Sequence, residues 1–90
     1  MNFQERITTI LCGLTKLLVK KNTDYGSHYL KDSKVGTKAY VRLCDRIEEK
    51  HSRLANLIKD DAPDNAIINE CLDIAGAAVL MIDVLKGEKA

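Results

Sequence analysis

The sequence predicts an all-α fold in which three long helices form an antiparallel helical bundle that is completed by oligomerisation. Apolar residues recur every three or four positions through most of the chain, and no segment alternates as a β-strand does. The length of 90 residues favours one domain over residues 1–90. A chain this short buries only a marginal core by itself. We therefore expect self-association to cover the apolar surface that remains.

The first helix is expected over residues 3–20. Its apolar side chains form a single stripe, made of Phe3, Ile7, Ile10, Leu11, Leu14, Leu17 and Leu18. Residues 21–36 lose this period and collect Asn, Gly, Ser and Asp, which are turn-forming residues. Long connections in small domains are usually functional or mobile. We therefore expect a functional loop over residues 21–36.

The second and third helices are expected over residues 37–59 and 64–85. Pro63 separates them, since proline is tolerated only in the first turn of a helix. The periodicity predicts the inward side of the second helix as Tyr40, Leu43, Cys44, Ile47, Leu54, Leu57 and Ile58. For the third helix it predicts Ile67, Ile68, Cys71, Ile74, Ala75, Ala78, Ile82 and Leu85.

The composition narrows the possible partners. The chain has 14 basic and 13 acidic residues, a net charge of +1, which argues against a general nucleic-acid binder. No apolar run is long enough to span a membrane, and the N-terminus does not have the pattern of a signal peptide. We expect a cytoplasmic protein. Its three cysteines are widely spaced and lie among apolar residues, so we expect buried free thiols.

The segment K-K-N-T-D-Y-G at residues 20–26 carries more chemistry than a connection needs. Lysines, a carboxylate and a tyrosine beside a glycine suit a charged, planar ligand, with Tyr25 as a stacking surface. The alternative interpretation is a helix end and turn, with Gly26 or Asn22 in a left-handed conformation.

The second helix adds the cations Arg46, Lys50 and Arg53, which can bind phosphate. Carboxylates three or four residues apart share a helix face, as at Asp45, Glu48 and Glu49, and at Glu70 and Asp73 in the third helix. If those faces meet, they form an oxygen-rich site suited to magnesium. Surface ion pairing explains the same pattern equally well.

Three motifs carry a resemblance to a known family: K-N-T-D-Y-G at residues 21–26, R-L-A-N-L at residues 53–57 and D-I-A at residues 73–75. From residue 21 onward the chain resembles the nucleotide modification associated domain, a family of short phage and bacterial helical proteins. It is similar in turn to the MazG-like nucleoside triphosphate pyrophosphohydrolases. The resemblance implies a helical fold, a nucleotide ligand and, for the enzymes, magnesium.

The chain departs from that family pattern at its acidic positions. Asn65 and Asn69 stand where the family tends to have carboxylates, and only Asp73 is kept. An amide keeps hydrogen-bonding capacity but loses the charge that holds a metal. This favours nucleotide binding without turnover, with a cyclic nucleotide or ADP-ribose-type immune signal sequestered in the host cytoplasm by a phage protein. The alternatives are a magnesium-dependent pyrophosphohydrolase and a structural or partner-binding helical module.

The expected ligand-binding residues are Lys21, Asn22, Asp24, Tyr25, Gly26, Arg46, Lys50 and Arg53. No catalytic residue and no cofactor is expected for the binding protein. For the enzyme, Mg²⁺ would be held by Glu49, Glu70 and Asp73. The expected partners are a nucleotide and further copies of the chain, with no membrane and no nucleic acid.

Overall fold

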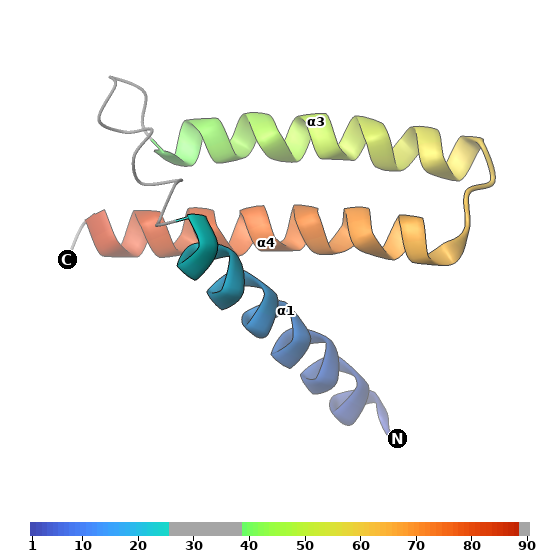
Figure 1. Cartoon of the computed structure of the whole chain (residues 1–90), viewed down its shortest axis with the longest axis horizontal. Helices are drawn as coiled ribbons and strands as arrows, with labels where there is room; N and C mark the ends of the chain where they lie inside the picture. Colours follow the sequence, from blue (N-terminus) through green and yellow to red (C-terminus); the bar gives the residue numbers. More distant parts are fainter. Residues whose placement is uncertain (26–38, 89–90) are drawn as a thin grey trace.

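The computed structural model describes residues 1–25 and 39–88, with side chains for residues 1–22 and 39–87. These residues form three α-helices, labelled as in Figure 1: α1 (Phe3–Tyr25), α3 (Ala39–Lys59) and α4 (Asp64–Glu88). Within the described ranges there is no strand, which confirms the all-α prediction there. Gly26 and the rest of the expected loop after it lie outside these ranges.

Helix α1 starts at a capped N-terminus and continues past its expected end. The Asn2 side chain accepts a hydrogen bond from the Glu5 amide at 2.8 Å, which satisfies one of the open donors of the first turn. The expected loop is wrong for residues 21–25, which are helical. Lys21 follows Leu17 and Leu18 by one turn on the same face, so the polar residues here continue the helix instead of ending it.

Helices α3 and α4 lie side by side and form the main packing unit (Figure 1). The buried side chains between them are small or aliphatic, and Tyr40, Ile47, Leu80 and Met81 pack around a core of Ala39, Leu43, Ala77 and Val84. The inward positions of α3 continue through Lys50, which is largely buried although it is charged. A polar position therefore lies on the seam between the two helices.

The connection from α3 to α4 is a short, hydrogen-bonded turn. The Ala62 amide donates to the Leu57 carbonyl at 2.9 Å and the Asp61 amide to the Ile58 carbonyl at 3.1 Å, the two bonds of a Schellman motif. Asp61 has a φ of 58°, the left-handed conformation that this motif requires. The Pro63 carbonyl then accepts the first bonds of α4, so proline sits where no amide is needed.

The inward side of α4 differs from the expected one. Its buried positions are Glu70, Gly76, Ala77 and Val84. Of the residues expected inside, Ile68, Cys71, Ala78 and Ile82 are exposed. The periodicity failed because α4 is apolar on nearly every side, so its sequence does not single out the side that meets α3.

Helix α1 touches the pair near its C-terminal end and diverges from it toward the N-terminus (Figure 1). A Cβ placed on Gly76 would lie 3.2 Å from Leu18 and 3.8 Å from Leu14, so a glycine allows this close approach. Leu14 is buried there, whereas Phe3 is 70% exposed. The packing of α1 therefore covers only one end of its apolar stripe.

Two further expectations concern the thiols and the membrane. Cys12, Cys44 and Cys71 are all exposed, so the prediction of buried thiols is wrong. Cys44 is exposed although Leu43 beside it is buried, because adjacent residues of a helix point in different directions. Across the described residues, no helix has both the length and the apolar character needed to cross a membrane.

Candidate functional site

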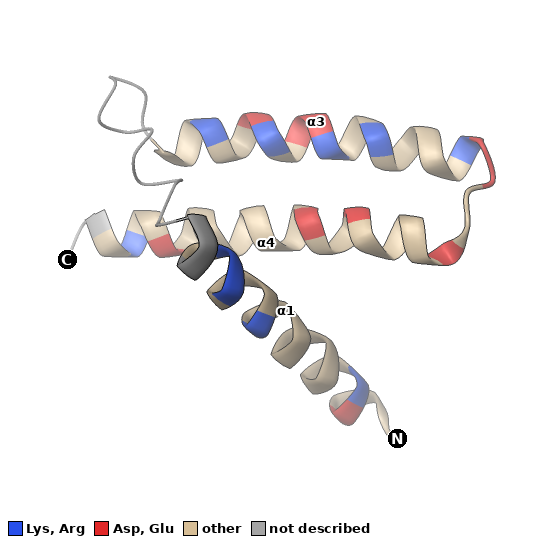
Figure 2. Cartoon of the chain, in the orientation of Figure 1, with Lys and Arg blue, Asp and Glu red and all other residues tan. Residues whose placement is uncertain are grey.

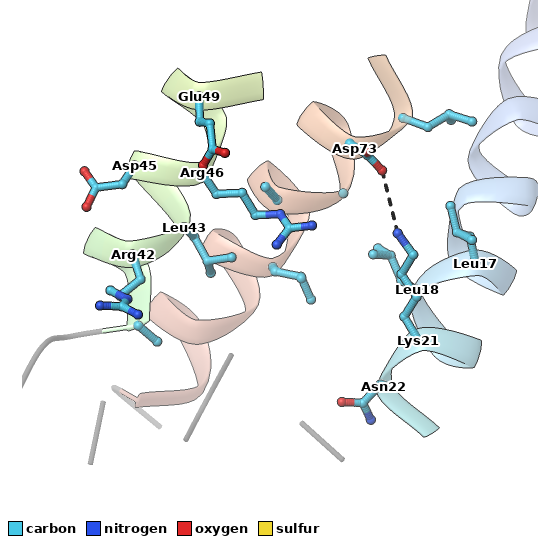
Figure 3. Close-up of a pocket in the computed structure, with 15 residues that line it drawn as sticks. Leu17, Leu18, Lys21, Asn22, Arg42, Leu43, Asp45, Arg46, Glu49 and Asp73 are labelled. Atoms are coloured by element: carbon cyan, nitrogen blue, oxygen red, sulfur yellow. Dashed lines mark ion pairs between the residues drawn. The ribbon is translucent and has the colours of Figure 1, made fainter. Parts of the chain in front are cut away.

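A cleft of about 760 Å³ lies where α1, the start of α3 and the middle of α4 approach one another (Figure 3). This volume is within the range of small-molecule sites. Its floor is apolar and is formed mainly by Leu17, Leu18, Leu43, Leu72, Ala77 and Leu80. Its rim is charged or polar and is formed by Lys21, Asn22, Arg42, Asp45, Arg46, Glu49 and Asp73.

The rim residues of α1 reach the cleft because the helix extends beyond Lys20. Lys21 and Asn22 occupy the turn that follows Leu17 and Leu18, which pack toward α4. The Lys21 ammonium lies 3.6 Å from the Asp73 carboxylate across the cleft, as Figure 3 shows. Lys21 is therefore both a rim residue and a link between α1 and α4.

The rim residues of α3 come from its first three turns. Arg42 and Arg46 are four residues apart and so share a face of the helix. In Figure 3, Arg46 extends from α3 into the space facing α4 and Lys21, whereas Asp45 points away from it. No carboxylate of the described residues pairs with Arg46. Its guanidinium is thus a donor fork directed into the cleft and available to an anion.

Beside the cleft, the central charges of α3 and α4 form an ion-pair network. Glu70 is 7% exposed, and its carboxylate lies 3.3 Å from the Arg53 guanidinium and 3.9 Å from the Lys50 ammonium. Lys50 also lies 3.1 Å from Asp73. Asp73 thus pairs with Lys50 on one side and with Lys21 on the other, which connects the network to the rim of the cleft.

One atom of this network is incompletely satisfied. The Glu70 Oε2 is buried and has no hydrogen-bond partner among the described residues, and the Lys50 ammonium lies 3.9 Å from it. A buried carboxylate depends on its cations because burial penalises an unpaired charge strongly. Lys50, itself largely buried, is therefore the critical partner, whereas Arg53 is mostly exposed.

Glu49, Glu70 and Asp73 are not grouped as a metal site in the described structure. Within the described part of the chain, no group of three acidic, histidine or cysteine side chains is placed to hold a metal ion. Glu70 and Asp73 are paired with Lys50, Arg53 and Lys21, and Glu49 stands on the α3 wall of the cleft. Basic side chains lie beside Glu70 and Asp73. Figure 2 shows the charges along each helix.

The expected ligand residues divide into three groups. Lys21, Asn22 and Arg46 line the cleft. Lys50 and Arg53 do not line it and pair with Glu70 instead. Asp24 and Tyr25 belong to the last turn of α1, and their side chains, like Gly26, lie outside the described part.

Arg42 lines the cleft but is not among the expected ligand residues, and the apolar floor is not predicted from the sequence. Arg42 could have been found from its spacing of four residues before Arg46. The floor could not, because Leu72 and Leu80 lie on a side of α4 that the periodicity does not distinguish.

Comparison of the chain with protein-family models, curated proteins and solved structures gives no match.

Proposed function

We propose that this protein binds a phosphate-bearing nucleotide in the cleft between α1, α3 and α4 and holds it without turnover. The observation that carries the proposal is the Arg46 guanidinium, which extends into an apolar-floored cleft and has no carboxylate partner among the described residues. Arginine recognises phosphate through two parallel hydrogen bonds. Lys21 and Arg42, on the same rim, add positive charge around that position.

The cleft offers both kinds of contact that a nucleotide requires. A base or ribose ring can lie on the leucines of the floor, and phosphates can lie beside the basic side chains of the rim, Lys21, Arg42 and Arg46. Asn22 on the rim can hydrogen-bond a polar edge of the ligand. We assign stacking to Tyr25 and a base or ribose hydrogen bond to Asp24, as the K-N-T-D-Y-G motif suggests.

Binding without hydrolysis is favoured over a pyrophosphohydrolase. Metal-assisted hydrolysis requires carboxylates that are free to hold the ion and to activate water. Glu70 and Asp73 are instead neutralised by Lys50, Arg53 and Lys21. The amides of Asn65 and Asn69, at positions where the similar family tends to be acidic, support the same preference.

A protein that binds a nucleotide and leaves it intact can act by lowering the free concentration of that nucleotide. We propose this sequestering role in the host cell cytoplasm, for a phage-encoded protein whose ligand is a cyclic nucleotide or an ADP-ribose-type immune signal. The resemblance to small phage and bacterial nucleotide-associated proteins supports it. We further propose that the helices form an antiparallel bundle completed by a homo-oligomer.

Thermal unfolding with a ligand panel tests the proposal. The purified protein is heated with nucleotides, cyclic dinucleotides and ADP-ribose derivatives, with and without Mg²⁺, and the ligands are then recovered and chromatographed. We expect at least one ligand to raise the melting temperature without Mg²⁺ and to be recovered intact. Magnesium-dependent product would instead support the hydrolase. No stabilisation by any ligand would favour the structural module.

A further inference from the structure

The open side of α4 is as apolar as a buried side. Viewed along the helix, one side of α4 meets α3 through Ala77 and Val84, and a second meets α1 at Gly76. A third side carries Ile68, Cys71, Ala75, Ala78, Val79 and Ile82. Of these, Ile68 is 55% exposed and Ile82 is 54% exposed. A helix that is apolar all round belongs in the interior of a larger assembly.

The N-terminal half of α1 presents a second uncovered apolar surface. Phe3, Ile7, Ile10 and Leu11 continue the stripe that Leu14 and Leu18 begin at the contact with α4, but all four are exposed. Figure 1 shows this half of α1 projecting away from α3 and α4. A projecting amphipathic helix is marginal in water on its own, since most helix stability in proteins comes from packing of the apolar face.

The two surfaces match each other in charge and in size. Neither residues 7–15 of α1 nor residues 74–82 of α4 include a charged residue, and Figure 2 shows both segments free of charge colours. The α1 surface is made of large side chains, whereas the centre of the α4 surface contains Ala75 and Ala78. Large side chains fit over small ones when two helices approach closely.

One copy of the chain cannot bring its own two surfaces together. Leu14 and Leu18 hold the C-terminal half of α1 against Gly76, and Lys21 pairs with Asp73 on that same side of α4. The open surface of α4 lies on a different side of the helix. A rigid α1 that is fixed on one side of α4 does not reach the other.

We infer that a second copy of this chain covers both surfaces, with the N-terminal half of each α1 packed on the open side of the partner's α4. Two identical contacts then form around a two-fold axis, as in a self-complementary interface. This inference rests on the proposed self-association and specifies its surfaces. It is independent of the ligand, because none of the interface residues lines the cleft.

Sedimentation velocity over a range of protein concentrations tests it with two variants and two controls. Ile10→Asp and Ile82→Asp each place a carboxylate in one of the two surfaces, which would be costly to bury. Thr8→Asp and Asn65→Asp place the same charge on exposed positions outside those surfaces. We expect the parent and the controls to form dimers, and each test variant to dissociate about tenfold more readily or more.

A mixture of the two variants tests the exchanged geometry. A dimer of Ile10→Asp with Ile82→Asp keeps one undamaged contact, whereas each variant alone keeps none. We therefore expect the dimer fraction to rise on mixing. Circular dichroism confirms folding of each variant, and the milder pair Ile10→Ser and Ile82→Ser is used if either aspartate variant unfolds.

The outcomes separate self-association from the choice of surfaces. A parent that stays monomeric at every concentration would overturn both. Test variants that associate as well as the parent would overturn the surfaces alone, and a mixture with no more dimer than its components would overturn the exchange of α1. None of these results bears on nucleotide binding by the cleft.

Discussion

The ammonium of Lys50 lies 3.1 Å from the carboxylate of Asp73 and joins the middle of α3 to the middle of α4. The same ammonium lies 3.9 Å from the buried Oε2 of Glu70. Asp73, which was expected to bind magnesium, and Lys50, which was expected to bind phosphate, are thus paired with each other. The pairing decides how the cleft and the core should respond to substitution.

Lys50→Ala should destabilise the fold much more than Arg53→Ala, although both cations contact Glu70. Loss of Lys50 leaves a buried carboxylate poorly compensated and should lower the free energy of unfolding by about 3 kcal/mol. Arg53 is 59% exposed, so its loss should cost less than about 1 kcal/mol. Urea unfolding at one protein concentration measures both.

The double variant Lys50→Met with Glu70→Leu provides the control for that comparison. It removes both charges, so its stability should return close to that of the parent. A double variant as unstable as Lys50→Ala would show that Lys50 contributes through packing and not through the ion pair.

Asp73→Asn should strengthen binding of an anionic ligand. The substitution removes a negative charge from the cleft rim and releases Lys21 and Lys50 from a competing carboxylate. We expect an affinity increase of about fivefold, the size of a modest ion-pair term near a protein surface. Titration with a fluorescent nucleotide measures it. The hydrolase would be favoured instead if binding by the parent required Mg²⁺ and Asp73→Asn weakened that binding.

Gly13→Ala and Gly76→Ala should differ in their effects. Both lie within helices, where alanine is favoured over glycine by roughly 0.5–1 kcal/mol. A Cβ at Gly13 meets no atom within 4 Å, whereas one at Gly76 lies 3.2 Å from Leu18. Gly13→Ala should therefore raise the free energy of unfolding by the full helix preference for alanine, and Gly76→Ala should raise it by less. Equal gains in urea unfolding would mean that α1 does not pack closely on α4.

Asp61→Gly should stabilise the turn between α3 and α4. Asp61 has a φ of 58°, which costs an L-residue energy and costs glycine almost none. The free energy of unfolding should rise by up to about 1 kcal/mol. Glycine also gives the unfolded chain more conformational entropy, which offsets part of this gain. Thermal unfolding measures it, with Asp60→Gly as the control that should destabilise. Loss of stability in Asp61→Gly would show that its side chain has a role of its own.

The sequence predicts the helical class well because periodicity and Pro63 are local signals. It fails where the signal is not local. Helix α1 continues to Tyr25, and its Lys21 pairs with Asp73 of α4, a contact that no pattern within α1 records. The inward side of α4 is mispredicted because three sides are apolar, and only the packing of α3 selects one of them.

The candidate site is predictable to a similar extent. Lys21, Asn22 and Arg46 follow from residue chemistry together with helical spacing, and they line the cleft. Lys50 and Arg53 have the same chemistry but pair with Glu70, because they lie further along α3, where α4 carries its carboxylates. Charge type is visible in a sequence, whereas the partner of each charge depends on how two helices align.

Titration with trinitrophenyl-ATP, a fluorescent nucleotide, tests nucleotide binding in the cleft most directly. The parent protein, Arg46→Ala and Lys59→Ala are compared, the last removing an exposed cation of α3 outside the cleft. We expect saturable binding by the parent and by Lys59→Ala, and an affinity lower by about tenfold or more for Arg46→Ala. Saturable binding with equal affinity for the parent and Arg46→Ala would refute nucleotide binding at this cleft.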